Sequence, residues 1–211
     1  MNSVDDAPDP DPDPDPDPDA SDSRDEREES DGREDLDLAS DRLRRRVLWS
    51  MPSGLYLIGS SAEIDGQRRS NLMTANLVMQ VCVEPKLIAA SIDVASLTYE
   101  LICSGGSFSV SLLRREDRPI VRKFVKPVTD FSVDDQRRVR EMAREPVFEL
   151  QDGLPVLTRS LAWLACTVKY RIELGTHALF IGELTGVGGD PVEDRRIEVL
   201  RMEDTRMNYG G

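Results

Sequence analysis

Short apolar runs separated by turn signals fill residues 55–202, and this pattern most constrains how the chain can fold. We expect strands over residues 55–60, 72–83, 86–93, 107–113, 147–150, 161–173, 177–186 and 197–202. Asp65-Gly66, Asp152-Gly153 and Gly175 provide turns between them. Because the strands are joined by such turns and do not alternate with long helices, the sequence predicts a mainly β, antiparallel barrel or sandwich.

The predicted helices are few and short. Ser96 has the residue type of an N-cap, and Gly105-Gly106 would end the helix that it begins. Two further surface helices are predicted over residues 118–125 and 134–144.

An acidic, proline-rich segment opens the chain. Residues 1–40 hold 17 Asp and Glu side chains against three Arg, and they include an Asp-Pro repeat. Without aromatic residues this segment cannot bury enough apolar surface to offset its chain entropy, so we expect a disordered tail. A docking arm for a basic partner is the alternative. Residues 41–211 are close to neutral and should form one domain, entered by a helix that Ser40 or Asp41 caps and Pro52 ends.

The near-neutral body argues against several classes of protein. Binding to nucleic acid would require a basic face, so no nucleic-acid partner is expected. The sequence has no apolar run long enough to span a bilayer and no secretory start, so we expect no membrane contact and a cytoplasmic location.

Cys82, Cys103 and Cys166 are widely spaced in apolar surroundings, which predicts buried, reduced thiols.

Most catalytic motifs are absent from the sequence. With a single histidine, His177, and no CxxC pair, no metal site is expected. Neither GxxxxGK[ST] nor GxGxxG occurs, which argues against nucleotide folds that begin a helix with a Gly-rich loop. His177 follows Gly175-Thr176 and precedes an apolar strand. It could donate to a cofactor or substrate, or it could be a turn histidine satisfied by a backbone carbonyl.

Residues 70–113 are rich in small polar side chains and poor in charge. The polar side chains include, in chain order, Thr74, Asn76, Ser91, Ser96 and Thr98. Hydroxyls and free N–H groups at the start of a helix can hold a phosphate. The alternative is that Ser96 is an ordinary N-cap and Thr74 an ordinary strand residue.

The order of these segments resembles the split-barrel flavin reductase family. The matching segments are Pro52-Ser53-Gly54-Leu55-Tyr56, residues 71–76 (NLMTAN), the Glu84-Pro85 bend, Ser96-x-Thr98, residues 104–110 (SGGSFSV) and residues 175–183 (GTHALFIGE). The resemblance implies an FMN-binding split β-barrel of Greek-key topology and a homodimer with flavin near the subunit interface. It also implies hydride transfer from NADH or NADPH to FMN or FAD, with reduced flavin passed to a partner monooxygenase in many members. Lys86 and Ser111 depart from the family pattern and leave the choice of flavin and nucleotide open.

The resemblance assigns roles by position. It places Asn71, Leu72, Met73, Thr74, Ala75 and Asn76 along the flavin, Ser91 and Ile92 near its ring or ribityl chain, Ser96 and Thr98 at its phosphate, and His177 on the nicotinamide side as the catalytic residue. Such a site needs ring stacking more than an acid–base pair. Two alternatives stay open: a flavoenzyme that holds FMN tightly and acts on its own substrate, and a non-catalytic flavin carrier or sensor.

Overall fold

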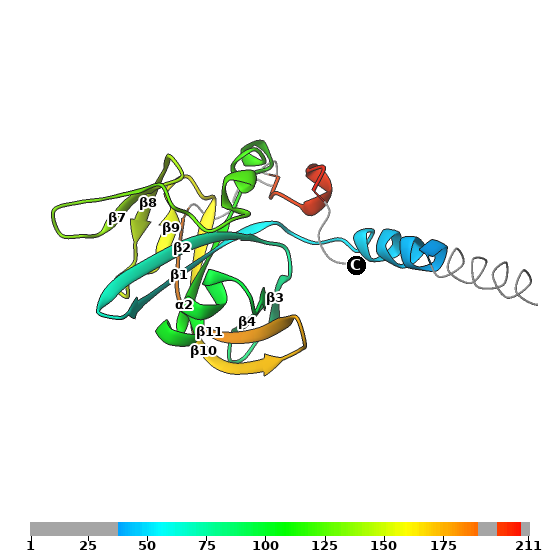
Figure 1. Cartoon of the computed structure of the whole chain (residues 1–211), viewed down its shortest axis with the longest axis horizontal. Coiled ribbons are helices and arrows are strands. Elements are labelled where there is room, and N and C mark those ends of the chain that lie inside the picture. The colour runs from blue at the N-terminus through cyan, green and yellow to red at the C-terminus, as the bar shows by residue number, and fades with distance from the viewer. Residues whose placement is uncertain (1–37, 190–197, 208–211) are drawn as a thin grey trace, which may run out of the picture. The chain divides into compact units, whose positions relative to one another are not determined.

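The computed structural model describes residues 38–189 and 198–207, and the chain divides into two compact units with the boundary between Ser50 and Met51. Both sheets belong to the second unit (Figure 1). The acidic tail predicted to be disordered covers residues 1–40, of which residues 1–37 lie outside the described residues.

The first unit contributes one helix to the described part, over residues 38–49. This helix already includes Leu38, so the expectation that Ser40 or Asp41 caps it is wrong. The helix ends at Trp49, before Pro52, as the proline predicts.

Seven antiparallel strands form the main sheet, in the order β2-β1-β5-β10-β11-β4-β3. They are β1 (Tyr56–Ile64), β2 (Gln67–Ala75), β3 (Val78–Cys82), β4 (Leu87–Asp93), β5 (Ser107–Leu112), β10 (Ala162–Glu173) and β11 (His177–Gly189). Figure 1 shows the β1–β2 and β10–β11 hairpins as two long curved ribbons on either side of helix α2 (Leu97–Gly105). The mainly β prediction is confirmed. Closure into a Greek-key split barrel stays a prediction, since β2 and β3 are the edges of this sheet.

The hairpin between β1 and β2 has the turn that the sequence predicts. Asp65 and Gly66 have φ angles of 52° and 69°, as a two-residue type I′ turn requires. The single strand expected over residues 72–83 is instead divided into β2 and β3, because Asn76 and Leu77, which connect them, are not in a strand. The carbonyl oxygen of Leu77 accepts the N–H of Ser91 at 2.9 Å.

Four strands form a second sheet: β6 (Phe131–Val133), β7 (Val139–Met142), β8 (Glu145–Glu149) and β9 (Pro155–Leu157). The predicted helix over residues 134–144 is therefore wrong. In its place, Oδ1 of Asp134 accepts the main-chain N–H groups of Arg138 and Gln136, each at 2.9 Å, and Oδ2 accepts from the Arg140 guanidinium. The bond from the Arg138 N–H is the main cause that lowers the pKa of Asp134 to about 2. The charged residues that predict a surface helix thus begin with a turn, which the carboxylate of Asp134 stabilises.

Two other predicted elements differ from the structure. Residues 118–125 form no α-helix but follow one 3₁₀ turn, η1 (Arg115–Asp117), and contain a second, η2 (Ile120–Phe124). Residue 197 of the strand expected over residues 197–202 lies outside the described residues. The rest of that range forms single bridges at Val199 and Arg201, followed by η3 (Met202–Asp204).

Strand β1 separates two apolar cores. Leu57 and Ile58 are both fully buried, yet they belong to different clusters, since successive side chains of a strand point to opposite faces. Leu57 packs in the core that contains Phe124 of η2, and Ile58 packs in the core that contains Phe108 of β5 and Phe180 of β11. A strand buried on both faces can position residues for a site at either side.

The serines of β5 hold the second sheet against the first. The Ser109 hydroxyl donates to the carbonyl oxygen of Pro155 at 2.7 Å, and Oγ of Ser111 accepts the N–H of Leu157 at 3.4 Å. Both serines are fully buried. The alternation of apolar and serine residues in β5 is as predicted, but its polar face binds β9, a strand that the sequence reading missed.

The three cysteines are free, and they differ in exposure. Cys166 is buried, and burial raises the pKa of its thiol to about 12, which makes it a poor nucleophile. Cys103 is exposed and Cys82 is half-buried, so the expectation of three buried thiols is wrong for both of them. In the part of the chain that the structure describes, no helix has the length and apolar character that crossing a bilayer demands.

Candidate functional site

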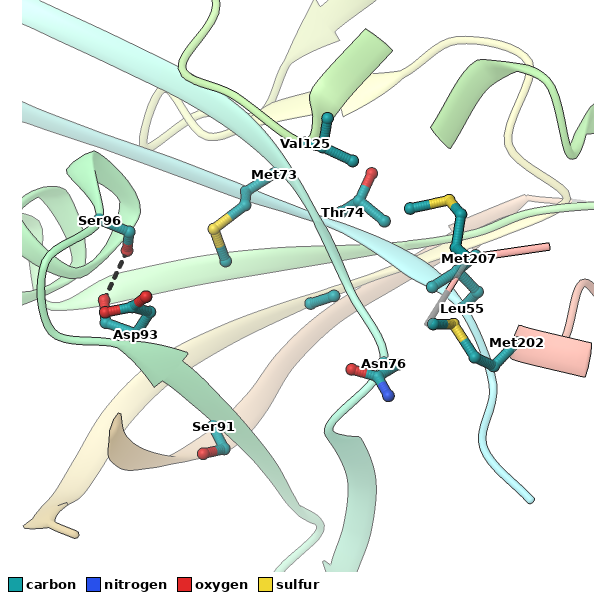
Figure 2. A pocket seen from close by; sticks show the side chains of 11 residues that line it. Leu55, Met73, Thr74, Asn76, Ser91, Asp93, Ser96, Val125, Met202 and Met207 are labelled. Atoms are coloured by element: carbon teal, nitrogen blue, oxygen red, sulfur yellow. Dashed lines mark hydrogen bonds between the residues drawn. The ribbon is translucent and has the colours of Figure 1, made fainter. Parts of the chain in front are cut away.

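One pocket of the second unit lies where β2, β4 and the start of α2 meet the C-terminal segment. Its volume is about 200 Å³. The lining residues are Leu55, Met73, Thr74, Ala75, Asn76, Ser91, Asp93, Ser96, Val125, Met202 and Met207. Figure 2 shows a polar side around Asp93 and Ser96 and, opposite it, an apolar side with two methionines. The pocket therefore offers hydrogen bonds on one side and apolar contact on the other.

The polar side is built at the junction of β4 and α2. Oγ of Ser96 accepts the N–H of Tyr99 at 3.1 Å, which caps α2, and its hydroxyl donates to the main-chain oxygen of Asp93 at 2.7 Å (Figure 2). Oδ1 of Asp93 accepts the N–H of Ala95 at 2.9 Å. The prediction that Ser96 caps this helix is confirmed. Its bonds fix the turn that presents the end of β4 to the pocket.

The apolar side brings together residues far apart in the sequence. Met202 and Met207 are the first and last residues of the C-terminal segment, by which we mean residues 202–207, and Val125 follows η2. The N–H of Met202 donates to the carbonyl oxygen of Ser53 at 3.0 Å, which ties this segment to the entry of β1. The sequence reading identified none of these residues, because no periodicity or motif links them.

Six of the eleven predicted site residues line this pocket: Met73, Thr74, Ala75, Asn76, Ser91 and Ser96. The others, apart from His177, are buried and do not line it. Leu72 and Ile92 are fully buried in the two cores. The Asn71 amide donates to Oγ1 of Thr98 at 3.0 Å and accepts the N–H of Val128 at 3.1 Å, so it connects β2 to α2. Contact of any of these residues with a flavin stays a prediction.

His177 lies beside the pocket but is not among its lining residues. It begins β11 and is the register partner of Asp93 on β4. Its Nδ1 is 3.0 Å from Oγ1 of Thr176, and the carbonyl oxygen of Thr176 accepts the N–H of Val94 at 3.1 Å. Strand pairing thus places His177 next to a lining residue, and its catalytic role stays a prediction.

Asp93 gives the pocket an acidic group that the sequence reading overlooked. Its carboxylate stands at the start of α2, where the resemblance places a phosphate, and like charges at close range repel. The hydroxyls of Ser96 and Thr98 already have protein partners. Within residues 38–189 and 198–207, no three His, Cys, Asp or Glu side chains gather in a metal-binding arrangement.

The Thr74 hydroxyl donates to the carbonyl oxygen of Val121 at 2.6 Å and so joins β2 to η2. Thr74→Val removes this donor and leaves a part-buried carbonyl without its partner. We expect the free energy of unfolding to fall by about 1–2 kcal/mol, measured by urea denaturation. Thr74→Ser keeps the hydroxyl and should retain most of the stability. Equal denaturation midpoints for Thr74→Val and the wild type would show that this bond stabilises nothing.

Known proteins are similar to this unit in sequence and in architecture. The family model described as "Flavin reductase like domain" matches residues 48–207, which include every residue that lines the pocket. The chain belongs to the flavin reductase-like family. The resemblance seen in the sequence is thereby confirmed, and the pocket lies inside the matched region.

Individual members of the flavin reductase-like family are moderately similar to this chain. It is 29% identical over 144 residues to "NADH-dependent flavin reductase StyB" of Pseudomonas fluorescens, covering 68% of this chain and 76% of that protein. It is 30% identical over 145 residues to "Probable flavin reductase" of Rhizobium meliloti (strain 1021), covering 68% of this chain but 42% of that protein. The solved structure of the Styrene Monooxygenase Flavin Reductase (SMOB) from Pseudomonas putida S12 has a TM-score of 0.55 and 25% identity, covering 70% of this chain and 86% of that one. The chain thus spans less than half of the Rhizobium protein and most of the other two.

Proposed function

We propose that this flavin reductase-like protein is an NAD(P)H-dependent flavin reductase that transfers a hydride from NADH or NADPH to FMN, with FAD as the alternative flavin. The observation that supports this most is the pocket between β2, β4 and α2, inside the region of the family match. A flavin ring has apolar faces and hydrogen-bonding edges, and walls made of methionines, hydroxyls and an amide suit both.

The main task of the protein in this reaction is to hold the two rings in the right position. A bound flavin supplies the hydride acceptor, and transfer depends on the nicotinamide ring stacking on it at close range. We assign Ser91 and Asn76 to hydrogen bonds with the ring edge, and Met73 to contact with a ring face. His177, at the start of β11, would contact the nicotinamide side.

A homodimer is part of this proposal. The pocket, at about 200 Å³, is smaller than the roughly 300–1,000 Å³ of most ligand sites, which suits a site that a second copy completes. Strand β3 is an edge strand, and apolar side chains along it and beside it are exposed: Leu77 45%, Met79 65%, Val81 47% and Val83 75%. An exposed apolar stripe on an edge strand is typical of an interaction surface.

We extend the proposal to a partner and a location. SMOB is described as the flavin reductase of a styrene monooxygenase, which supports a partner monooxygenase as the consumer of reduced flavin here. A cytoplasmic location agrees with this role, because pyridine nucleotides and flavins are cytoplasmic metabolites. The acidic segment over residues 1–40 is a candidate docking arm for the partner.

The proposal predicts that the purified full chain oxidises NADH or NADPH only when FMN or FAD is added, because free flavin is the second substrate. The loss of reduced-nicotinamide absorbance measures the turnover, and light scattering after gel filtration should give the mass of two chains. FMN that remains bound through gel filtration, with no reduction of added flavin, would favour the flavoenzyme with its own substrate. Flavin binding without oxidation of either nucleotide would favour the carrier or sensor.

A variant at His177 tests whether this residue contacts the nicotinamide ring or the flavin ring. His177→Gln should raise the KM for the nicotinamide nucleotide by about fivefold and leave the Kd of the flavin unchanged, because the residue is assigned to the nicotinamide side. A changed flavin Kd with an unchanged KM would remove His177 from that role.

A further inference from the structure

A second pocket of the same unit is dominated by arginines. Its volume is about 520 Å³. The lining residues are Arg118, Pro119, Arg122, Glu203, Asp204, Thr205 and Arg206. They come from η2 and the residues just before it, and from the segment that contains η3. We call this the arginine pocket, and the pocket at β2, β4 and α2 the first pocket.

Among the described residues, the three guanidinium groups of the arginine pocket have no partner. In the described ranges, 38–189 and 198–207, no ion pair or side-chain hydrogen bond involves Arg118, Arg122 or Arg206, whereas many other arginines of the unit pair with a carboxylate. Like charges that share one pocket repel each other. A bound anion would remove that cost.

The two carboxylates of the pocket do not neutralise these arginines, because other groups already engage them. Oδ1 of Asp204 is 2.6 Å from Nε of Arg115, and Oδ2 accepts the N–H of Arg201 at 2.9 Å. Oε1 of Glu203 is 3.3 Å from Nη1 of Arg201. The pocket is therefore left with an excess of positive charge.

The arginine pocket and the first pocket share two walls. Met202 and Met207 line the first pocket, while the residues between them line the arginine pocket. On the other wall, Arg122 lines the arginine pocket and Val125, three residues later, lines the first pocket. A ligand with a ring in the first pocket and an anionic group a short distance from that ring could therefore occupy both.

We propose that the arginine pocket binds a phosphate group of the nucleotide whose flavin or nicotinamide ring lies in the first pocket. The inference rests on the proposed function, which supplies the ring. Guanidinium groups form paired, charge-assisted hydrogen bonds to phosphate oxygens, and three of them around one pocket are suited to such a group. The start of α2 is less suitable, because the carboxylate of Asp93 lies there.

Two sources could supply the phosphate: the flavin nucleotide, or the 2′-phosphate of NADPH. The test uses the full chain with Arg118→Gln, Arg122→Gln and Arg206→Gln combined. The matched control combines Arg42→Gln, Arg44→Gln and Arg46→Gln, which removes the same charge from the helix over residues 38–49. The Kd values of riboflavin, FMN and FAD are measured by fluorescence titration, and the KM values of NADH and NADPH by turnover.

The expected result is that at least one phosphate-bearing ligand is weakened about tenfold or more by the pocket variant and not by the control, while the Kd of riboflavin is unchanged. Weaker binding of both FMN and FAD would identify the flavin phosphate as the group in the arginine pocket. Weaker binding of FAD alone would identify the adenylate half of FAD. A raised KM for NADPH relative to NADH would identify the 2′-phosphate. Unchanged values for all ligands, or an equal loss for riboflavin, would overturn the inference and leave the proposed function intact. A wild-type protein that binds no flavin and oxidises neither nucleotide would overturn both.

Discussion

Ser91→Trp is expected to abolish flavin binding while the protein remains folded. Ser91 lies on β4 and lines the first pocket, whose volume is about 200 Å³ (Figure 2). An indole group at this position would fill the space to which the proposed function assigns a flavin ring, and the open pocket lets it do so without displacing the core. We expect the Kd of FMN to rise at least 100-fold, which is about 2.7 kcal/mol of binding free energy. Fluorescence titration measures it, and circular dichroism checks the fold.

The matched control is Ser132→Trp. Ser132 lies on β6 of the second sheet and is exposed, so the same substitution there adds an indole group outside the pocket. The Kd of FMN should not change in this variant. If Ser91→Trp is folded and binds FMN as tightly as the control does, the flavin does not bind in the first pocket. Ser91→Leu, with a smaller side chain, should give an intermediate loss.

The features that the sequence predicted well are those with a local physical cause. The Asp65-Gly66 turn needs positive φ angles, which these residue types tolerate, and Ser96 satisfies N–H groups of the helix that follows it. Residues 73–75 of β2 and the following Asn76 are adjacent in the chain, so the resemblance, which assigns roles by position, could place all four at the pocket. Each of these predictions depends on neighbours within a few residues.

The features that the sequence did not predict depend on contacts between distant segments. Residues 134–144 have the charge of a surface helix, but two buried side chains, Val139 and Met142, pack in a core that also contains Leu57 of β1. Met207 lines the first pocket only because main-chain bonds tie the C-terminal segment to the entry of β1. No local pattern marks either residue set. The arginine pocket was missed for the same reason, since residues 123–202 separate its two walls in the sequence.

At Gly59, strand β1 lies directly against the main chain of β9 in the second sheet. It is the register partner of Ser109 on β5, whose hydroxyl donates to the carbonyl oxygen of Pro155 on β9. A Cβ at Gly59 would overlap both that carbonyl oxygen and that hydroxyl. Since the carbonyl belongs to the main chain, it cannot rotate away as the end of a flexible side chain could. The bond that fixes β9 on the main sheet therefore requires glycine here.

Gly59→Ala is accordingly expected to be among the most destabilising single substitutions in the protein. Overpacking against main chain together with loss of the Ser109 bond should lower the free energy of unfolding by roughly 3 kcal/mol or more. The thermal midpoint should fall by roughly 10 °C. Gly186→Ala is the matched control, because its Cβ would meet the Trp163 ring at an ordinary 3.5 Å. Urea and thermal denaturation of both variants give the comparison, and equal midpoints for the two would show that the sheets can separate at Gly59 without cost.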